Sequence, residues 1–185
     1  MRALLLTTCL FICRVAHAGD GIAPAPEPTP HLAVSGMLGI ATPLGFVGAE
    51  LEARLARWLS VSAGVGLAAS GVQGAVMARP AIPIGDDANV YLGLGASAGR
   101  WVWFEFPPDE AQKTWNIAYW ANAELGVWYR YRSPAWSGRL FLGYSRILNR
   151  DGYECTQEVE HCMEAHTRDG ENLIYVGYSV ARSFD

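Results

Sequence analysis

The chain has 185 residues, of which 51% are hydrophobic and 17% are charged, and its formal net charge is −4. This length suits a single domain, and the acidic balance excludes the broad basic surface that nucleic-acid binding requires. We therefore expect one folded domain with no nucleic-acid partner and no bound cofactor.

The first eighteen residues follow the plan of a cleavable secretory signal. One basic residue, Arg2, precedes the apolar run 3–12, and the small-x-small pattern Ala-His-Ala fills positions 16–18. Cleavage at this point would remove Arg2 and Arg14 and leave 12 basic against 18 acidic residues, a formal charge of −6. The sequence therefore predicts an exported, acidic protein in an oxidising compartment.

A proline-rich segment, residues 19–30, follows the predicted cleavage site. Its core, IAPAPEPTP, has four prolines in nine residues and no apolar periodicity. This composition is typical of an extended linker, because it offers no face that a core could bury. The folded domain is therefore predicted to span residues 31–185.

From residue 31 onward, hydrophobic residues recur at every second position, which is the period of a β-strand. Residues 59–78 carry no charge, as a membrane helix would, but their alternation and four glycines favour two strands joined at Ser70-Gly71. An even number of strands lets an antiparallel sheet close without free edges. Alternation and turn residues predict eight strands: 31–41, 46–57, 59–70, 74–84, 88–105, 116–131, 138–149 and 172–184.

The connections between these strands differ in length at the two ends. If the N-terminus is periplasmic, the connections at 57–58, 85–88 and 133–137 lie on the periplasmic side, and all are short. The two longest connections, 106–115 and 150–171, then lie on the outer side. Short inner turns and long outer loops are typical of outer-membrane barrels. The predicted fold is therefore all-β, an eight-stranded antiparallel transmembrane up-and-down barrel in the bacterial outer membrane.

The stretch 117–131, IAYWANAELGVWYRY, indicates what the two faces of a strand carry. Apolar side chains from Tyr119 to Tyr129 occupy odd positions, whereas Asn122 and Glu124 occupy even positions. We assign the apolar face to lipid and the polar face to the interior of the barrel. The same alternation assigns these charged residues to the interior: Glu50, Glu52, Arg54, Arg79, Glu124, Arg130 and Arg139.

These interior charges are expected to pair with one another. An eight-stranded barrel is just wide enough for its side chains to fill it, so the interior glutamates should meet Arg54 and Arg79 in a nearly dry core. The substitution Glu124→Ala should then destabilise the barrel, because it leaves a buried charge uncompensated. The alternation slips near Gly99-Arg100, which indicates a β-bulge and leaves the direction of Arg100 unassigned.

Aromatic residues gather near both ends of the predicted strands. Tyr119 and Tyr129 lie ten residues apart on one face, which corresponds to roughly 26 Å across the membrane at about 3.4 Å per residue and a tilt near 40°. Amphipathic rings favour the headgroup level of a bilayer. We therefore assign eight residues to two interfacial belts: Trp58, Trp101, Trp103, Trp115, Tyr119, Tyr129, Tyr131 and Trp136.

The period-two strands, the aromatic belts and the last strand, NLIYVGYSVARSF, resemble the small eight-stranded outer-membrane barrels of the OmpA and OmpX kind. The resemblance covers residues 31–185 and concerns architecture, without a diagnostic functional motif. Barrels of this kind commonly end on an aromatic residue that assists assembly, whereas here Phe184 is followed by Asp185.

The predicted outer loop at 149–172 is strongly acidic, with seven acidic residues against two arginines, and it is the candidate surface for a partner. Cys155 and Cys162 are the only cysteines after the predicted cleavage site, and they are expected to form a disulfide worth roughly 2.5 kcal/mol. The alternative is a metal site with His161 and His166, although the spacing does not match a common zinc pattern.

Three classes of function remain open. The favoured one is a monomeric, non-enzymatic cell-envelope protein with a filled, ion-paired interior, which acts structurally or through its outer loops. The second is a narrow, porin-like pore for small solutes, which conductance in planar bilayers would distinguish. The third is a lipid-modifying enzyme, but no predicted strand places a histidine beside a serine, since the mature histidines are His31, His161 and His166.

Overall fold

The computed structural model describes residues 32–84, 87–104, 112–131, 135–155 and 171–184. All regular secondary structure within these ranges is β-strand. No helix in the described part of the chain is long and apolar enough to cross a membrane. The predicted signal and the proline-rich linker lie outside the described residues.

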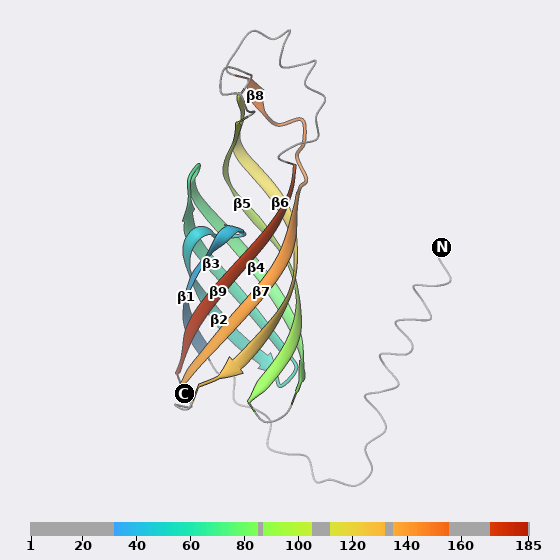
Figure 1. Ribbon diagram of the computed structural model, residues 1–185. Helices are drawn as coiled ribbons and strands as arrows, with labels where there is room; N and C mark the ends of the chain where they lie inside the picture. Colours follow the sequence, from blue (N-terminus) through green and yellow to red (C-terminus); the bar gives the residue numbers. More distant parts are fainter. Residues whose placement is uncertain (1–31, 85–86, 105–111, 132–134, 156–170, 185) are drawn as a thin grey trace, which may run out of the picture.

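Eight long strands form one closed antiparallel barrel, as the sequence predicts (Figure 1). Each long strand pairs with the next long strand in the chain, and one further pairing, of the first strand with the last, closes the ring. The strands are β1 (Leu32–Thr42), β2 (Gly45–Ala56), β3 (Leu59–Ala68), β4 (Gly71–Pro83), β5 (Ala88–Phe104), β6 (Gln112–Arg130), β7 (Trp136–Ile147) and β9 (Asn172–Phe184), with a two-residue β8 (Glu154–Cys155).

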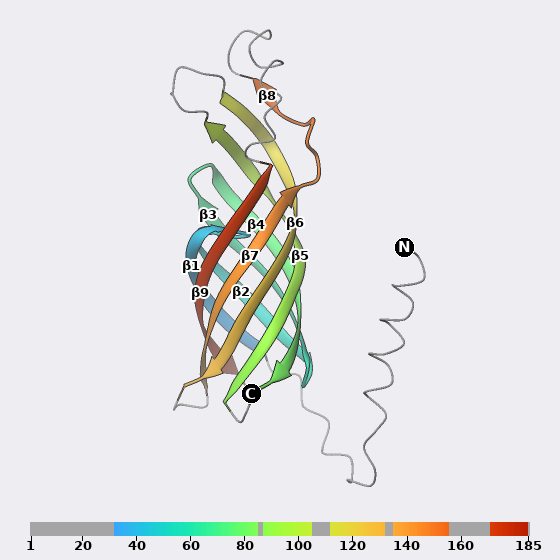
Figure 2. The ribbon, with the colours of Figure 1, turned by 45° about the vertical axis from the view of Figure 1, so that its right-hand side comes forward.

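The two ends of the barrel differ. The end at which β1 begins and β9 finishes also carries the connections 57–58, 84–87 and 131–135, and we call it the short-loop end. At the opposite end, which we call the hairpin end, β5 and β6 rise beyond the other strands (Figure 2). There β8 pairs with β6 opposite Lys113 and Thr114, so it extends the projecting part without entering the ring.

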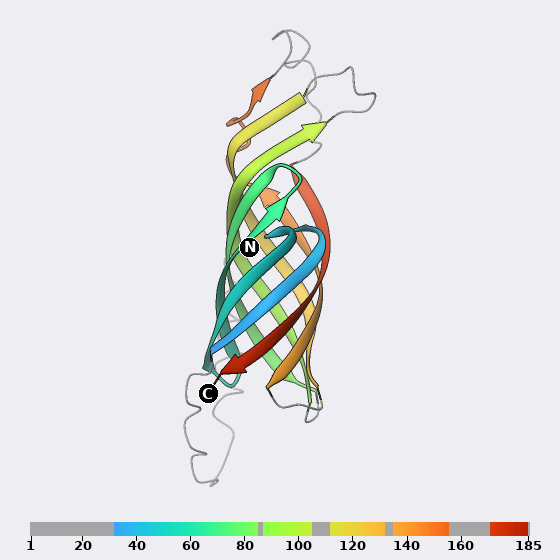
Figure 3. The same ribbon diagram turned by 90° about the vertical axis from the view of Figure 1, so that its left-hand side faces the viewer.

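A β-bulge marks the place where β5 leaves the barrel wall. The register of β5 with β6 shifts between Gly99 and Trp101, which confirms the bulge that the sequence predicts near Arg100. The pairing of β5 with β4 ends at Gly99, and the Ser70 hydroxyl donates to the Arg100 carbonyl oxygen at 2.6 Å. Above this point β5 pairs with β6 alone, as the projecting hairpin shows in Figure 3.

The exterior of the barrel is apolar and the interior is largely polar. Leu125 of β6 lies in register between Leu92 of β5 and Leu142 of β7, and all three are 48–60% exposed. Their neighbours along the chain point inward, and Asn122 and Glu124 are at most 4% exposed. Alternation along each strand therefore places apolar side chains on the outer face and polar side chains on the inner face, as expected from a period of two.

Interior glycines make room for the large inward side chains. A Cβ on Gly126 would lie 2.6 Å from Cζ of Tyr91, and a Cβ on Gly143 or Gly177 would overlap the ring of Tyr175 or Phe141. A narrow barrel needs this pairing of small with large residues, because eight strands leave space for little more than their own side chains.

Candidate functional site

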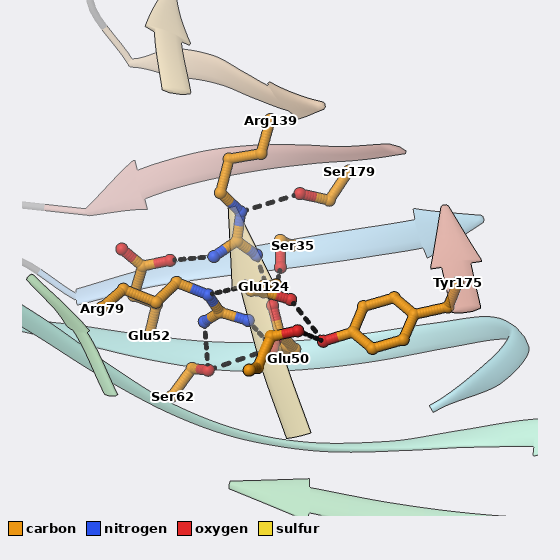
Figure 4. Close-up of polar contacts among 10 residues, drawn as sticks. Ser35, Glu50, Glu52, Ser62, Arg79, Glu124, Arg139, Tyr175 and Ser179 are labelled. Carbon is orange, nitrogen blue, oxygen red and sulfur yellow. Dashed lines mark hydrogen bonds and ion pairs between the residues drawn. The ribbon is translucent and has the colours of Figure 1, made fainter. Parts of the chain in front are cut away.

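The candidate site is a cluster of charged side chains in the barrel interior, which we call the interior network. It joins Glu50 and Glu52 of β2 to Arg79 of β4, Glu124 of β6 and Arg139 of β7 (Figure 4). All five residues are buried. Each occupies an inward position of its strand, so the alternation of the sequence and the closure of the ring together create the cluster.

Glu50 is the centre of the interior network. Its Oε1 accepts from Nη2 of Arg79 at 2.9 Å and from the Ser62 hydroxyl at 3.0 Å. Its Oε2 accepts from Nη2 of Arg139 and, at 3.5 Å, from the Ser35 hydroxyl. One carboxylate thus bridges both buried guanidinium groups, which offsets the cost of removing all three charges from water.

The remaining donors of the two arginines also have partners. Nε of Arg79 donates to Glu124 at 2.6 Å, and Nη1 of Arg139 donates to Glu52 at 2.9 Å. The other contacts of these arginines are with hydroxyl oxygens: Arg79 with Ser62 and Arg139 with Ser179. The Tyr175 hydroxyl donates to Glu124 at 3.3 Å. A buried charged cluster needs such hydrogen-bond partners for its charged groups in order to be stable.

The network divides the interior into three levels. Along each strand, Met37, Phe141 and Tyr175 lie closer to the hairpin end than the network residues Ser35, Arg139 and Ser179. These three side chains form one buried apolar cluster together with Leu44, which comes from the connection between β1 and β2. The hairpin side of the network therefore holds this apolar cluster together with the buried, hydrogen-bonded Ser97, Asn122 and Ser145, whereas the short-loop side carries arginines.

Arg54 and Arg130 occupy a different place from the one the sequence suggests. Within the described residues neither forms an ion pair, and the glutamates pair with Arg79 and Arg139 instead. Arg54 is half-buried with its guanidinium 5.0 Å from the centre of the Trp128 ring, and Arg130 is exposed at 5.9 Å from the same ring. Both lie nearer the short-loop end than the network, where water can solvate a guanidinium and no carboxylate is required.

A cavity of about 180 Å³ occupies the short-loop end below the network. Its lining runs from exposed residues of the rim, Arg57 and Trp58, to the buried residues Arg79 and Arg139. Tyr91 also belongs to the lining, and its buried hydroxyl has no hydrogen-bond partner among the described residues. A buried hydroxyl left unpaired costs about 1–3 kcal/mol, so this end of the interior is not as fully satisfied as the network.

The aromatic residues assigned to two belts do not all face outward. Trp58, Tyr119, Tyr131 and Trp136 are 38–59% exposed, and Tyr129 is half-buried. Trp115, by contrast, is only 1% exposed, because it packs with Trp120, Ile147 and Tyr153 in a second cluster. Trp101 is half-buried and meets Trp120 edge to face at 5.3 Å. The side chain of Trp103 lies outside the described part of the structure.

Three tyrosine hydroxyls meet on the outer wall near the short-loop end, a contact that the sequence analysis missed. The Tyr129 hydroxyl donates to Tyr178 at 2.9 Å, and Tyr131 contacts the same oxygen. The Tyr129 ring lies over Gly138 of the intervening strand β7, where a Cβ would lie 2.6 Å from Cζ. The signal was the glycine at position 138, which lets a ring from one strand reach the second strand along.

The predicted disulfide and its alternative, a metal site, involve residues outside the described part of the structure. The backbone of Cys155 belongs to β8, but its side chain and the whole of Cys162, His161 and His166 lie outside the described residues. Among the residues that are described, no group of three or more His, Cys, Asp or Glu side chains is arranged to hold a metal ion.

The chain has no match among the family models or the curated proteins with which it was compared.

Proposed function

We propose that the protein is an integral β-barrel of the bacterial outer membrane with a non-enzymatic role, structural or exerted through the loops of its hairpin end. The observation that carries this proposal is the inverted distribution of polarity. Contiguous apolar side chains such as Leu92, Leu125 and Leu142 cover the outer wall, whereas Glu50 and Arg139 are buried inside. Soluble monomers rarely expose apolar patches larger than a few hundred Å², while lipid suits such a wall.

The closed backbone supports the same proposal. Every long strand has a partner on both sides, so the backbone hydrogen bonds of the wall are made within the sheet. Only such closed barrels and helices can cross a bilayer, because its hydrocarbon core offers no water to unpaired backbone groups. The length difference between the connections favours an orientation with the short-loop end in the periplasm.

The filled interior favours a structural or surface role over a pore. The network and the apolar cluster of Met37, Leu44, Phe141 and Tyr175 occupy successive levels of the barrel. A solute would have to displace both levels, including ion pairs whose partners are buried. We therefore expect no conductance above background in planar bilayers, and reproducible single-channel steps would contradict this part of the proposal.

Membrane insertion is tested with two matched arginine substitutions on the exposed wall. Leu125→Arg places a charge between Tyr119 and Tyr129, near the expected middle of the bilayer, and should cost about 2–4 kcal/mol in lipid. Ile84→Arg, at an equally exposed apolar position of the short-loop end, should cost about 0–1 kcal/mol. Urea unfolding in lipid vesicles, followed by heat-dependent gel mobility, measures both.

A water-soluble barrel would give a different result. In that case the two variants would have equal stability, because both positions would face water, and the mature chain would stay soluble and monomeric without detergent. The non-enzymatic part is checked separately, by incubating the folded protein with phospholipid vesicles and measuring acyl-chain release or transfer. Turnover above that of empty vesicles would contradict it.

A further inference from the structure

The short-loop end carries an excess of positive charge that the interior network does not use. Among the described residues, the cavity at this end is lined by five arginines, Arg54, Arg57, Arg79, Arg130 and Arg139, and by one acidic residue, Glu52. Glu52 is already paired with Arg139 at 2.9 Å. Within the described residues, Arg54, Arg57 and Arg130 form no ion pair, so three guanidinium groups face a common space without a carboxylate.

The arginines of the cavity are held in place by packing. The guanidiniums of Arg54 from β2 and of Arg130 from β6 both lie within 6 Å of the centre of the Trp128 ring. Stacking on a ring leaves the in-plane N–H groups of a guanidinium available to an acceptor. The guanidinium groups of Arg54 and Arg130 are thus oriented before an anion binds, which lowers the entropic cost of binding.

Contact with lipid around the outer wall would not explain these arginines. Arg54 follows Glu50 and Glu52 on the inward face of β2, and Arg130 follows Asn122 and Glu124 on the inward face of β6. An arginine directed at lipid would instead occupy an outward-facing position of its strand. Arg182 of β9 occupies such a position, where it is exposed beside Trp136 and Phe184. The charge in the cavity is therefore directed at something that enters the barrel.

Tyr91 is a further residue of the cavity lining. Its hydroxyl is enclosed by protein and has no hydrogen-bond partner among the described residues. The cavity volume of about 180 Å³ is more than ten times the roughly 10–15 Å³ that one water needs by this measure. A compact anion with several acceptor oxygens would fit and would supply acceptors for the guanidiniums.

We propose that this cavity is a binding site for a phosphate group, held by Arg54, Arg57 and Arg130. Phosphate is favoured because its oxygens accept bidentate hydrogen bonds from several guanidiniums, and its charge exceeds that of a single carboxylate. The site opens at the short-loop end and needs no path through the barrel, so it is compatible with a filled interior and independent of membrane insertion.

The test uses the full mature chain folded in a non-ionic detergent, with pyrophosphate and inorganic phosphate as probes in isothermal titration calorimetry at low ionic strength. We expect saturable binding with one site, which weakens as salt is added. Arg54→Lys combined with Arg130→Lys preserves the charge but removes the two guanidinium groups, and should weaken binding at least about tenfold. The matched control Arg182→Gln removes an arginine of the same end from the outer wall and should leave binding unchanged.

The origin of the phosphate group is resolved by competition. Phosphatidylglycerol added to the micelles would displace pyrophosphate if a headgroup is the source, and would not if the ligand is a free phosphate compound; either result supports the site. The proposal is overturned if the wild-type protein binds no pyrophosphate, if the double lysine variant binds as tightly as wild type, or if acetate binds equally well. A shift in gel mobility on boiling, equal to that of the wild type, shows that the barrel of each variant is folded.

Discussion

Arg139 and Arg54 lie in the same barrel interior, yet their surroundings differ completely. Arg139 is 3% exposed and is held by Glu50, Glu52 and Ser179. Arg54 is half-buried and meets only the ring of Trp128 among the described residues. A guanidinium far from water requires carboxylates to compensate its desolvation, whereas one near the rim is solvated and can remain available. Depth in the barrel thus separates arginines that stabilise the fold through ion pairs from arginines that remain available to bind an anion.

The largest expected effect follows from removing the centre of the interior network. Glu50→Ala leaves Arg79 and Arg139 facing each other with one carboxylate each, and should lower the free energy of unfolding by about 3–5 kcal/mol. Urea unfolding of the reconstituted barrel measures this loss. Glu50→Gln, which keeps the volume and an acceptor oxygen, should lose less, and equal losses for the two variants would show that the charge accounts for the whole effect and packing for none of it.

A smaller loss is expected at the edge of the network. Glu124→Ala removes the 2.6 Å partner of Arg79 but leaves that arginine paired with Glu50, so the cost should be about 1–3 kcal/mol. The same unfolding experiment ranks it between the Glu50 and Arg54 variants. A loss greater than that of Glu50→Ala would mean that Glu124, and not Glu50, is the centre of the cluster.

The smallest effect is expected at the short-loop end. Arg54→Gln removes a contact with Trp128 and no ion pair, so its cost to stability should be about 0.5–1 kcal/mol. Raising the salt concentration should leave the stability of the network unchanged, because buried pairs are screened much less than exposed charges. A loss at Arg54 as large as that at Glu50 would contradict the division between the two sets of arginines.

The sequence predicted the fold well because the strand signal is local. Alternation along each segment located all eight long strands to within a few residues, and the slip in alternation near Arg100 marked the observed bulge. The inward direction of Glu50, Arg79 and Arg139 followed from the same period of two. These properties depend on neighbouring residues in one strand, so no knowledge of the closed ring was needed.

The aromatic residues were harder to assign, because their position depends on packing between strands. Trp115 has the composition of a belt residue, but the projecting part of β5 and β6 folds it against Trp120 and Ile147. The contact of Tyr129 with Tyr178 crosses a whole strand over Gly138. Neither arrangement follows from alternation within one strand, since each requires the register of three adjacent strands.

By itself, the sequence determined the number of strands, their alternating faces and the set of charges that point inward. Only the tertiary structure decided which of those charges meet, because the partners are far apart in the chain: Arg79 is 29 residues from Glu50, and Arg139 is 89 residues from it. The stagger and tilt of the strands set the depth of each side chain. That depth places Arg139 in the network and leaves Arg54 and Arg130 at the cavity, although all three share the inward parity.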